Sequence, residues 1–143
     1  MIKPFWIGDY MKLNKIKYSD LNSKAKENYN FAKISSALAD YGYNSMRLSD
    51  DYQGADFISL HDSGEDSLMV QLKGRWSIFK KYLGKNIKIA FRDGEDIYIY
   101  DHDDMVKTCE TLDLYVNTKS WIESGGYDCK ILPKKLIPYM TKL

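Results

Sequence analysis

The fold of this chain is decided by one stretch, Gly54-Ala55-Asp56-Phe57-Ile58-Ser59-Leu60-His61, then Asp62-Ser63-Gly64-Glu65-Asp66, then Ser67-Leu68-Met69-Val70-Gln71-Leu72-Lys73-Gly74. Its middle piece carries turn residues between two apolar runs, which predicts a β-hairpin. A hairpin centred on the Ser-Gly pair joins residues whose numbers sum to about 127, so Asp56 lies opposite Gln71. Alternate strand side chains share a face, so Gln71 and Lys73 point the same way. A carboxylate, an amide oxygen and an ammonium then meet on one patch, which can hold a divalent metal ion beside a positioned water.

The composition is typical of a soluble globular protein. Of its 143 residues, 44% are hydrophobic and 29% charged, and the mean hydropathy is −0.48. We therefore expect a single domain over residues 1–143. No apolar run approaches the roughly 18 residues of a membrane span, and the first residues show no signal-peptide pattern. Cys109 and Cys129 lack metal-ligand spacing, so we expect reduced thiols in a cytoplasmic protein.

Charge is unevenly distributed along the chain. From Gln71 to Arg92 there are seven basic residues and no acid, and from Asp93 to Asp104 there are six acids and no Lys or Arg. A basic run directly after a metal site could hold phosphates, although short charge runs are also common on solvated surfaces.

The pattern before the hairpin predicts an irregular arm over residues 1–18 and then a long helix. Ser19 or Asp20 is the expected N-cap, and the helix reaches about Ala39. Its buried stripe at i, i+3 and i+7 spacing consists of Phe31, Ile34, Leu38 and Tyr41, which Glu27 extends by one turn. Gly42 then acts as a C-cap signal.

The remaining patterns predict further strands and helices. We expect a short strand over 44–48, a loop over 50–54, and a helical or irregular segment over 75–82. A second hairpin, 86–92 with 95–100, turns at Asp93-Gly94, and both of its faces are apolar, as in central strands. Helices follow from Asp103 to about Leu112, over 118–124 and after Pro133, which makes residues 103–143 a helical region. The fold class is therefore α+β (mixed α/β), with a central sheet flanked by helices.

This order resembles the core of the PD-(D/E)XK nuclease superfamily, most closely its Holliday-junction-resolvase and type IV restriction-endonuclease branches. The resemblance covers about residues 20–100. The matching positions are Glu27, Gly42-Tyr43, Met46-Arg47-Leu48, Gly54-Ala55-Asp56-Phe57-Ile58 and Val70-Gln71-Leu72-Lys73. It implies a restriction-endonuclease-like mixed sheet and Mg²⁺- or Mn²⁺-dependent cleavage of DNA. Many small members of this fold need a second subunit, so a homodimer is plausible.

Two positions depart from the family pattern. Ala55 stands where a proline often precedes the aspartate, and Gln71 replaces the second acid. Some restriction-type members carry a similar glutamine. Loss of that negative charge should weaken divalent-metal binding.

The resemblance assigns a role to each candidate catalytic residue: Asp56, Gln71, Lys73 and Glu27. Asp56, the Gln71 amide and the Leu72 carbonyl would hold the metal, Lys73 would sit against the attacking water and the scissile phosphate, and Glu27 would complete the site. Each residue also has a plain structural interpretation. Asp56 could cap the preceding loop, Gln71 and Lys73 could be solvated strand residues, and Glu27 could be a surface acid among lysines. Asn30 could take the place of Glu27.

Four basic residues after the hairpin are candidates for contacting DNA phosphates: Arg75, Lys80, Lys81 and Lys85. The interleaved aromatics Trp76, Phe79 and Tyr82 are expected to be core anchors, and His61 and His102 to be structural. Three interpretations follow: a metal-dependent DNA endonuclease, a nuclease-like fold that binds nucleic acid or protein without cutting, and an α+β domain that acts through protein contacts.

Overall fold

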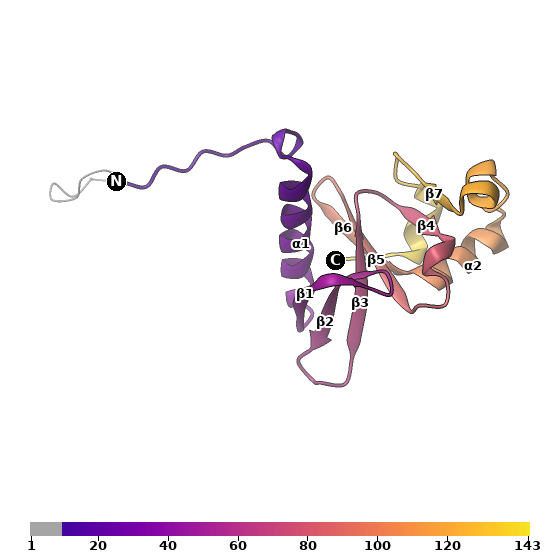
Figure 1. Cartoon of the computed structure of the whole chain (residues 1–143), viewed down its shortest axis with the longest axis horizontal. Helices are drawn as coiled ribbons and strands as arrows, with labels where there is room; N and C mark the ends of the chain where they lie inside the picture. Colours follow the sequence, from indigo (N-terminus) through magenta and orange to yellow (C-terminus); the bar gives the residue numbers. More distant parts are fainter. Residues whose placement is uncertain (1–9) are drawn as a thin grey trace.

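The computed structural model describes residues 10–143, so predictions for residues 1–9 lie outside the described part. Residues 10–17 form no helix or strand and reach away from the body as an extended arm (Figure 1). The body contains two α-helices and eight strands among these residues: α1 (Ser23–Ala39), β1 (Tyr43–Tyr52), β2 (Ala55–His61), β3 (Ser67–Lys73), β4 (Ser77–Phe79), β5 (Ile87–Asp93), β6 (Asp96–Asp101), α2 (His102–Leu112), β7 (Gly126–Asp128) and β8 (Thr141–Lys142).

Six of these strands form one mixed sheet in the order β1-β2-β3-β5-β6-β8. All neighbouring pairs are antiparallel except β3 and β5, which run parallel. The parallel pair requires a crossover, which residues 74–86 provide. With α1 and α2 packed on the sheet, the predicted α+β class is confirmed.

The register of the first hairpin is the predicted one. Phe57 pairs with Val70 and Leu60 pairs with Ser67, so the numbers in each pair sum to 127. The same register continued by one residue places Asp56 opposite Gln71. A shift of one residue would have moved every β2 side chain to the other face of the sheet.

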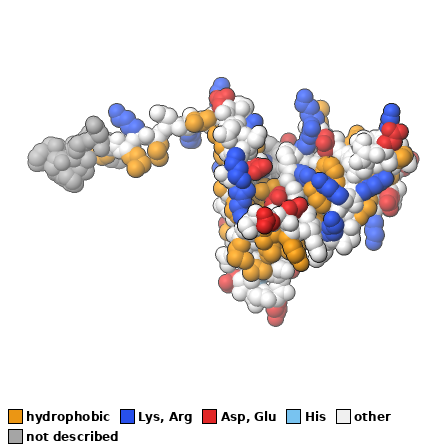
Figure 2. All heavy atoms as spheres, in the orientation of Figure 1, with side chains coloured by type: hydrophobic (Ala, Val, Ile, Leu, Met, Phe, Trp, Pro, Cys, Tyr) orange, Lys and Arg blue, Asp and Glu red, His pale blue; other side chains and the backbone are white. Residues whose placement is uncertain are grey.

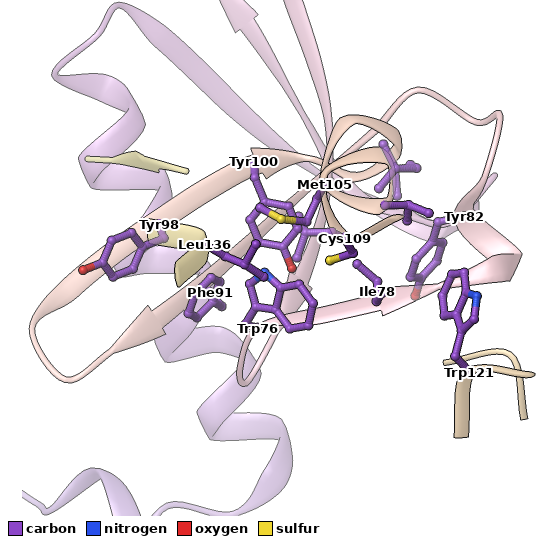
Figure 3. Packing of buried hydrophobic residues seen from close by; sticks show 14 residues of the cluster. Trp76, Ile78, Tyr82, Phe91, Tyr98, Tyr100, Met105, Cys109, Trp121 and Leu136 are labelled. Atoms are coloured by element: carbon purple, nitrogen blue, oxygen red, sulfur yellow. The ribbon is translucent and has the colours of Figure 1, made fainter. Parts of the chain in front are cut away.

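The sheet is packed on both faces, as the second hairpin predicts. On the α1 face, Ile34 and Leu38 pack with Phe57, Val70 and Ala90. On the α2 face lies a larger aromatic cluster, which includes Trp76, Tyr98 and Tyr100 (Figure 3). Strands β5 and β6 contribute alternate side chains to both clusters and are therefore central strands.

The start of α1 differs from the prediction. Ser19 and Asp20 lie in a 3₁₀ turn (Tyr18–Asp20), and the cap is Asn22, whose side-chain oxygen accepts the Ala25 N–H at 2.8 Å. Leu21 has extended backbone angles, which separate the turn from the helix. Asn is as good a cap as Ser or Asp, so composition alone did not select the position.

Three further predictions are corrected. Residues 50–52 belong to β1, whose pairing with β2 is irregular between Arg47 and Tyr52, so only Gln53 and Gly54 form the turn. The segment 75–82 contains strand β4 before a 3₁₀ turn, because β4 pairs with β7. Residues 103–143 are not purely helical, since β7 and β8 both find strand partners there.

Gly54 lies in the turn between β1 and β2, two residues before Asp56. Its φ is +90°, and a Cβ placed on it would lie 2.8 Å from Cδ1 of Tyr82, a buried ring. Gly64 in the next turn has φ +76° but nothing within 4 Å of its Cβ position. Both positions therefore favour glycine for their backbone, but only Gly54 also requires it for space.

We expect Gly54→Ala to lower the free energy of unfolding much more than Gly64→Ala. The left-handed backbone costs an alanine about 1–2 kcal/mol at either position, and overpacking against Tyr82 adds about 1–3 kcal/mol at Gly54 alone. Urea unfolding of both variants measures the difference. Equal losses would contradict the close contact with Tyr82.

Candidate active site

Asp56 lies at the start of β2, where the ladder between β2 and β3 ends. Its carboxylate is half-buried, and Oδ2 accepts the backbone N–H of Leu72 at 2.8 Å. The side chain thus replaces a backbone acceptor at the point where the two strands diverge. The predicted meeting of Asp56 with the Gln71–Lys73 strand end is present in the structure.

Leu72 brings a carbonyl oxygen to the same place, and the Gln71 side-chain amide contacts that oxygen. Gln71 is half-buried, and its Nε2 donates to the Leu72 carbonyl at 3.4 Å. The N–H and C=O of one strand residue point to the same edge, so the Leu72 carbonyl faces the side on which its N–H meets Asp56. The Asp56 carboxylate and the Leu72 carbonyl therefore lie on the same side of β3, and the Gln71 amide nitrogen contacts that carbonyl.

Lys73 is half-buried at the end of β3. Its ammonium lies 4.5 Å from the ring centre of Phe79 and 5.2 Å from that of Tyr82. Burial lowers the pKa of Lys73, and the neighbouring Lys81 lowers it further, whereas the nearby Asp56 carboxylate acts in the opposite direction. Lys73 is therefore a cation held by aromatic rings beside the carboxylate.

Negative charge accumulates around Asp56. Burial is the main reason that its pKa is raised, and the charges of Asp51 and Glu27 raise it as well. The Leu72 N–H and the Lys73 ammonium act the other way without reversing the shift. The site therefore holds a carboxylate that is less stable as an anion than an exposed one, which is typical of functional positions.

Glu27 is only loosely part of this arrangement. Its side chain is exposed and pairs with Lys24 at 3.5 Å, one turn earlier on α1. It affects Asp56 through its charge, without a hydrogen bond to any of the other predicted site residues. Asn30, the alternative to Glu27, instead accepts a hydrogen bond from Arg92 at 2.8 Å.

The four predicted phosphate contacts have different surroundings. Arg75 pairs with Asp128 of β7 at 3.2 Å. Lys80 lies over the Trp121 ring, 5.4 Å from its centre, and Lys85 is exposed. Lys81 lies over the same two rings as Lys73 and is the member of this group that adjoins the candidate site.

Two residues near the site were missed by the sequence analysis. Asp51 lies on the irregular end of β1, and its charge acts on both Asp56 and Lys73. Tyr82, expected only as a core anchor, is buried, and burial followed by the charges of Asp56 and Asp51 raises its pKa to about 12. The signal for Asp51 was its position just before the tight turn into β2.

The oxygen donors fit a hard divalent cation. Among residues 10–143, no group of three or more His, Cys, Asp or Glu side chains is placed to hold a metal ion. The arrangement offers instead one carboxylate from Asp56, the Leu72 carbonyl and the Gln71 amide. Mg²⁺ commonly takes one or two protein carboxylates and keeps several waters, so this set suits it better than it suits zinc. A cation here would also offset the repulsion between Asp56 and its acidic neighbours.

Comparison with known proteins leaves the family open. No protein-family model, no curated protein and no solved structure matches this chain. Within residues 10–143, neither helix combines the length and hydrophobicity needed to cross a bilayer. Both cysteines are free. Arguments about function therefore depend on the chemistry of the site.

We expect Asp56→Asn to stabilise the protein at neutral pH. The pKa of Asp56 is raised in the folded state, so its ionisation favours unfolding, and this group contributes most stability when protonated. Asparagine keeps an acceptor for the Leu72 N–H without the charge. The gain in the free energy of unfolding should be present at pH 7 and shrink toward about pH 3, where Asp56 is protonated in both states.

Asp101→Asn is the matched control for this experiment. Burial acts to raise the pKa of Asp101, but hydrogen bonds from Lys88 and from the Asp104 N–H outweigh it, and the pKa is lowered. This variant should therefore destabilise the protein at pH 7 and less so in acid. If Asp56→Asn instead lowers the free energy of unfolding at pH 7, the charge of Asp56 does not destabilise the folded protein.

Proposed function

We propose that this protein is a metal-dependent nuclease that hydrolyses DNA phosphodiester bonds in the cytoplasm. The observation that carries the proposal is the convergence of Asp56, Leu72 and Lys73 at the diverging ends of β2 and β3. Hydrolysis of a phosphodiester needs a nucleophile and a group that stabilises the negative charge growing on the phosphate. The Asp56 side of the site would hold a metal that generates the nucleophile, and the neighbouring Lys73 cation would stabilise the charge. The resemblance of the Asp56 and Gln71-Leu72-Lys73 motifs to PD-(D/E)XK nucleases supports the same class.

Different residues would bind the metal and stabilise the reacting phosphate. Asp56, the Leu72 carbonyl and the Gln71 amide oxygen would hold Mg²⁺ or Mn²⁺, which supplies Lewis-acid polarisation of the phosphate and a more acidic water when bound. Lys73 would place its ammonium against the phosphate oxygens and balance their growing negative charge. Its lowered pKa makes it a better partner for a proton on the attacking water than an exposed lysine would be.

The surface around the site suits a polyanion. Figure 2 shows acidic side chains near the centre of this face, over the end of β1, with Lys and Arg side chains on α1 to one side and around β4 to the other. Basic residues on both sides can contact a phosphate backbone. The acids in the middle would repel phosphates and attract a metal cation instead.

One observation favours a second candidate, a nuclease-like fold that binds nucleic acid without cutting it. The Asp56 carboxylate already caps the Leu72 N–H, and the neutral Gln71 offers its amide nitrogen to Leu72. The first bond joins β2 to β3, the second lies within β3, and neither needs a metal. The experiments below separate this possibility from catalysis, since only catalysis depends on the charges of Asp56 and Lys73 in the presence of metal.

Cleavage of supercoiled plasmid and of a four-way junction, in Mg²⁺ and then Mn²⁺, tests the proposal. We expect Lys73→Gln and Asp56→Asn each to slow cutting by about 10²-fold or more, because each removes a group that acts on the reacting phosphate. Lys107→Gln removes an exposed charge on α2 and should cut like wild type. Unchanged cutting by Lys73→Gln and Asp56→Asn, or no cutting by the wild type in either metal, would rule out this site as a nuclease centre.

A gain-of-function variant gives an independent test. We expect Gln71→Glu to lower the Mn²⁺ concentration for half-maximal cleavage by about tenfold, because a second carboxylate strengthens a divalent-cation site. Lys107→Gln, which lowers the net charge by the same one unit at an exposed position on α2, serves as the control for net charge. If the Mn²⁺ concentration for half-maximal cleavage stays the same or rises in Gln71→Glu, residue 71 is not a ligand.

A further inference from the structure

A pocket of about 290 Å³ adjoins the candidate site on the side of α1. It lies between the start of the helix, the end of β3 and the β5–β6 turn, and it shares Lys73 with the site. Its lining consists of Tyr18, Tyr29, Asn30, Lys73, Gly74, Arg92, Gly94 and Glu95. Apart from Lys73, none of these residues has a role in the proposed hydrolysis.

Arg92 is held rigidly at this pocket. Its Nε donates to the Asn30 side-chain oxygen at 2.8 Å, and one terminal nitrogen donates to the Gly94 carbonyl at 3.1 Å. Its guanidinium carbon lies 4.9 Å from the ring centre of Tyr18 and 4.7 Å from that of Tyr29. A guanidinium carries five N–H donors, so donors remain for a ligand after these two bonds.

Asn30 also orients Tyr18. Its amide nitrogen donates to the Tyr18 hydroxyl at 3.0 Å. Because the Tyr18 oxygen accepts this bond, its own O–H can be donated to a ligand. The pocket thus presents two donors, a guanidinium and a phenol, while the ammonium of its lining residue Lys73 lies over Phe79 and Tyr82 in the candidate site.

The cations at the pocket form no ion pairs within the described part of the protein. Among residues 10–143, neither Lys73 nor Arg92 forms an ion pair with a carboxylate. Both are half-buried, so each has lost part of the water that solvates an exposed cation. Lys26 and Lys33 lie over Tyr18 and Tyr29, which adds charge, and the acid in the lining, Glu95, is exposed.

We propose that this pocket binds a backbone phosphate of a nucleic-acid strand, next to the phosphate at Asp56 and Lys73. The proposal rests on the proposed function, because Lys73 links the two sites. Arg92 and Tyr18 bind the phosphate oxygens, and Asn30 is a positioning residue that holds both. The volume is at the lower end for small-molecule sites, so it suits a phosphate with its sugar rather than a larger cofactor. Binding here would fix which phosphodiester reaches the candidate catalytic residues.

Binding of a fluorescein-labelled octathymidylate in EDTA, followed by anisotropy at low salt, tests the proposal without any cleavage. We expect Arg92→Met to weaken binding about tenfold or more, since it removes a charge-assisted contact. The slope of log K against log salt should fall by about 0.7, the value for one phosphate contact on a single strand. Lys107→Met removes an exposed charge outside the pocket and should keep the wild-type affinity and slope.

Tyr18→Phe tests the same subsite in case Arg92→Met fails to fold. It keeps the ring beside Arg92 and removes only the hydroxyl, so binding should weaken about threefold or more while the thermal midpoint stays near that of the wild type. Tyr52→Phe, at a side chain that is 57% exposed, is its control and should bind like wild type. Wild-type affinity in both Arg92→Met and Tyr18→Phe would overturn the subsite.

Two further outcomes identify the ligand and separate the two proposals. If inorganic phosphate or thymidine monophosphate binds as tightly as the octamer, the assignment to a nucleic-acid strand is overturned. Arg92-dependent binding in EDTA without cleavage in Mg²⁺ or Mn²⁺ would support the phosphate subsite and overturn the proposed activity. If the wild type and Arg92→Met cleave DNA at the same rate, the subsite is overturned and the proposed activity is supported.

Discussion

The hydrogen bond from the Leu72 N–H to the Asp56 carboxylate is the interaction on which the candidate site depends. It forms where the pairing of β2 with β3 ends, so it fixes a half-buried carboxylate beside the half-buried end of β3. The register of the hairpin makes it possible, because only this pairing brings Asp56 opposite Gln71. Gln71, Leu72 and Lys73 acquire their places in the site as a consequence of that single alignment.

The same region carries charge that the fold does not neutralise. Asp56 is half-buried near the charges of Asp51 and Glu27, and its pKa is raised. Lys73 and Arg92 are half-buried without carboxylate partners among residues 10–143. Elsewhere the protein pairs such groups, as in the 2.6 Å contact between Lys88 and Asp101. Unpaired charges of both signs on adjoining surfaces reduce stability, and a ligand with a cation and phosphates would compensate both.

The sequence was most informative where short-range rules act. Turn residues located both hairpins, alternation gave the register of the first and the two apolar faces of the second, and together they predicted Asp56, Gln71 and Lys73 as neighbours. It was less informative where several residues satisfy the same rule. Ser19, Asp20 and Asn22 can all cap a helix, and the short strand β4 became a strand because β7, about fifty residues later, pairs with it. Local propensity carries no information about such a distant partner.

The sequence by itself therefore determined the α+β class, the main hairpin and its register, and with them the placing of Asp56 opposite Gln71. Only the tertiary structure decided what surrounds them: that Glu27 stays at the surface, that the charge of Asp51 acts on Asp56, and that Tyr82 lies buried within reach of both charges. It also decided that Tyr18, Tyr29 and Asn30 enclose Arg92. The physical reason is range. Hairpin register follows from a period of two and a turn a few residues long, whereas the hydrogen bond between Asn30 and Arg92 joins α1 to β5 across 62 positions.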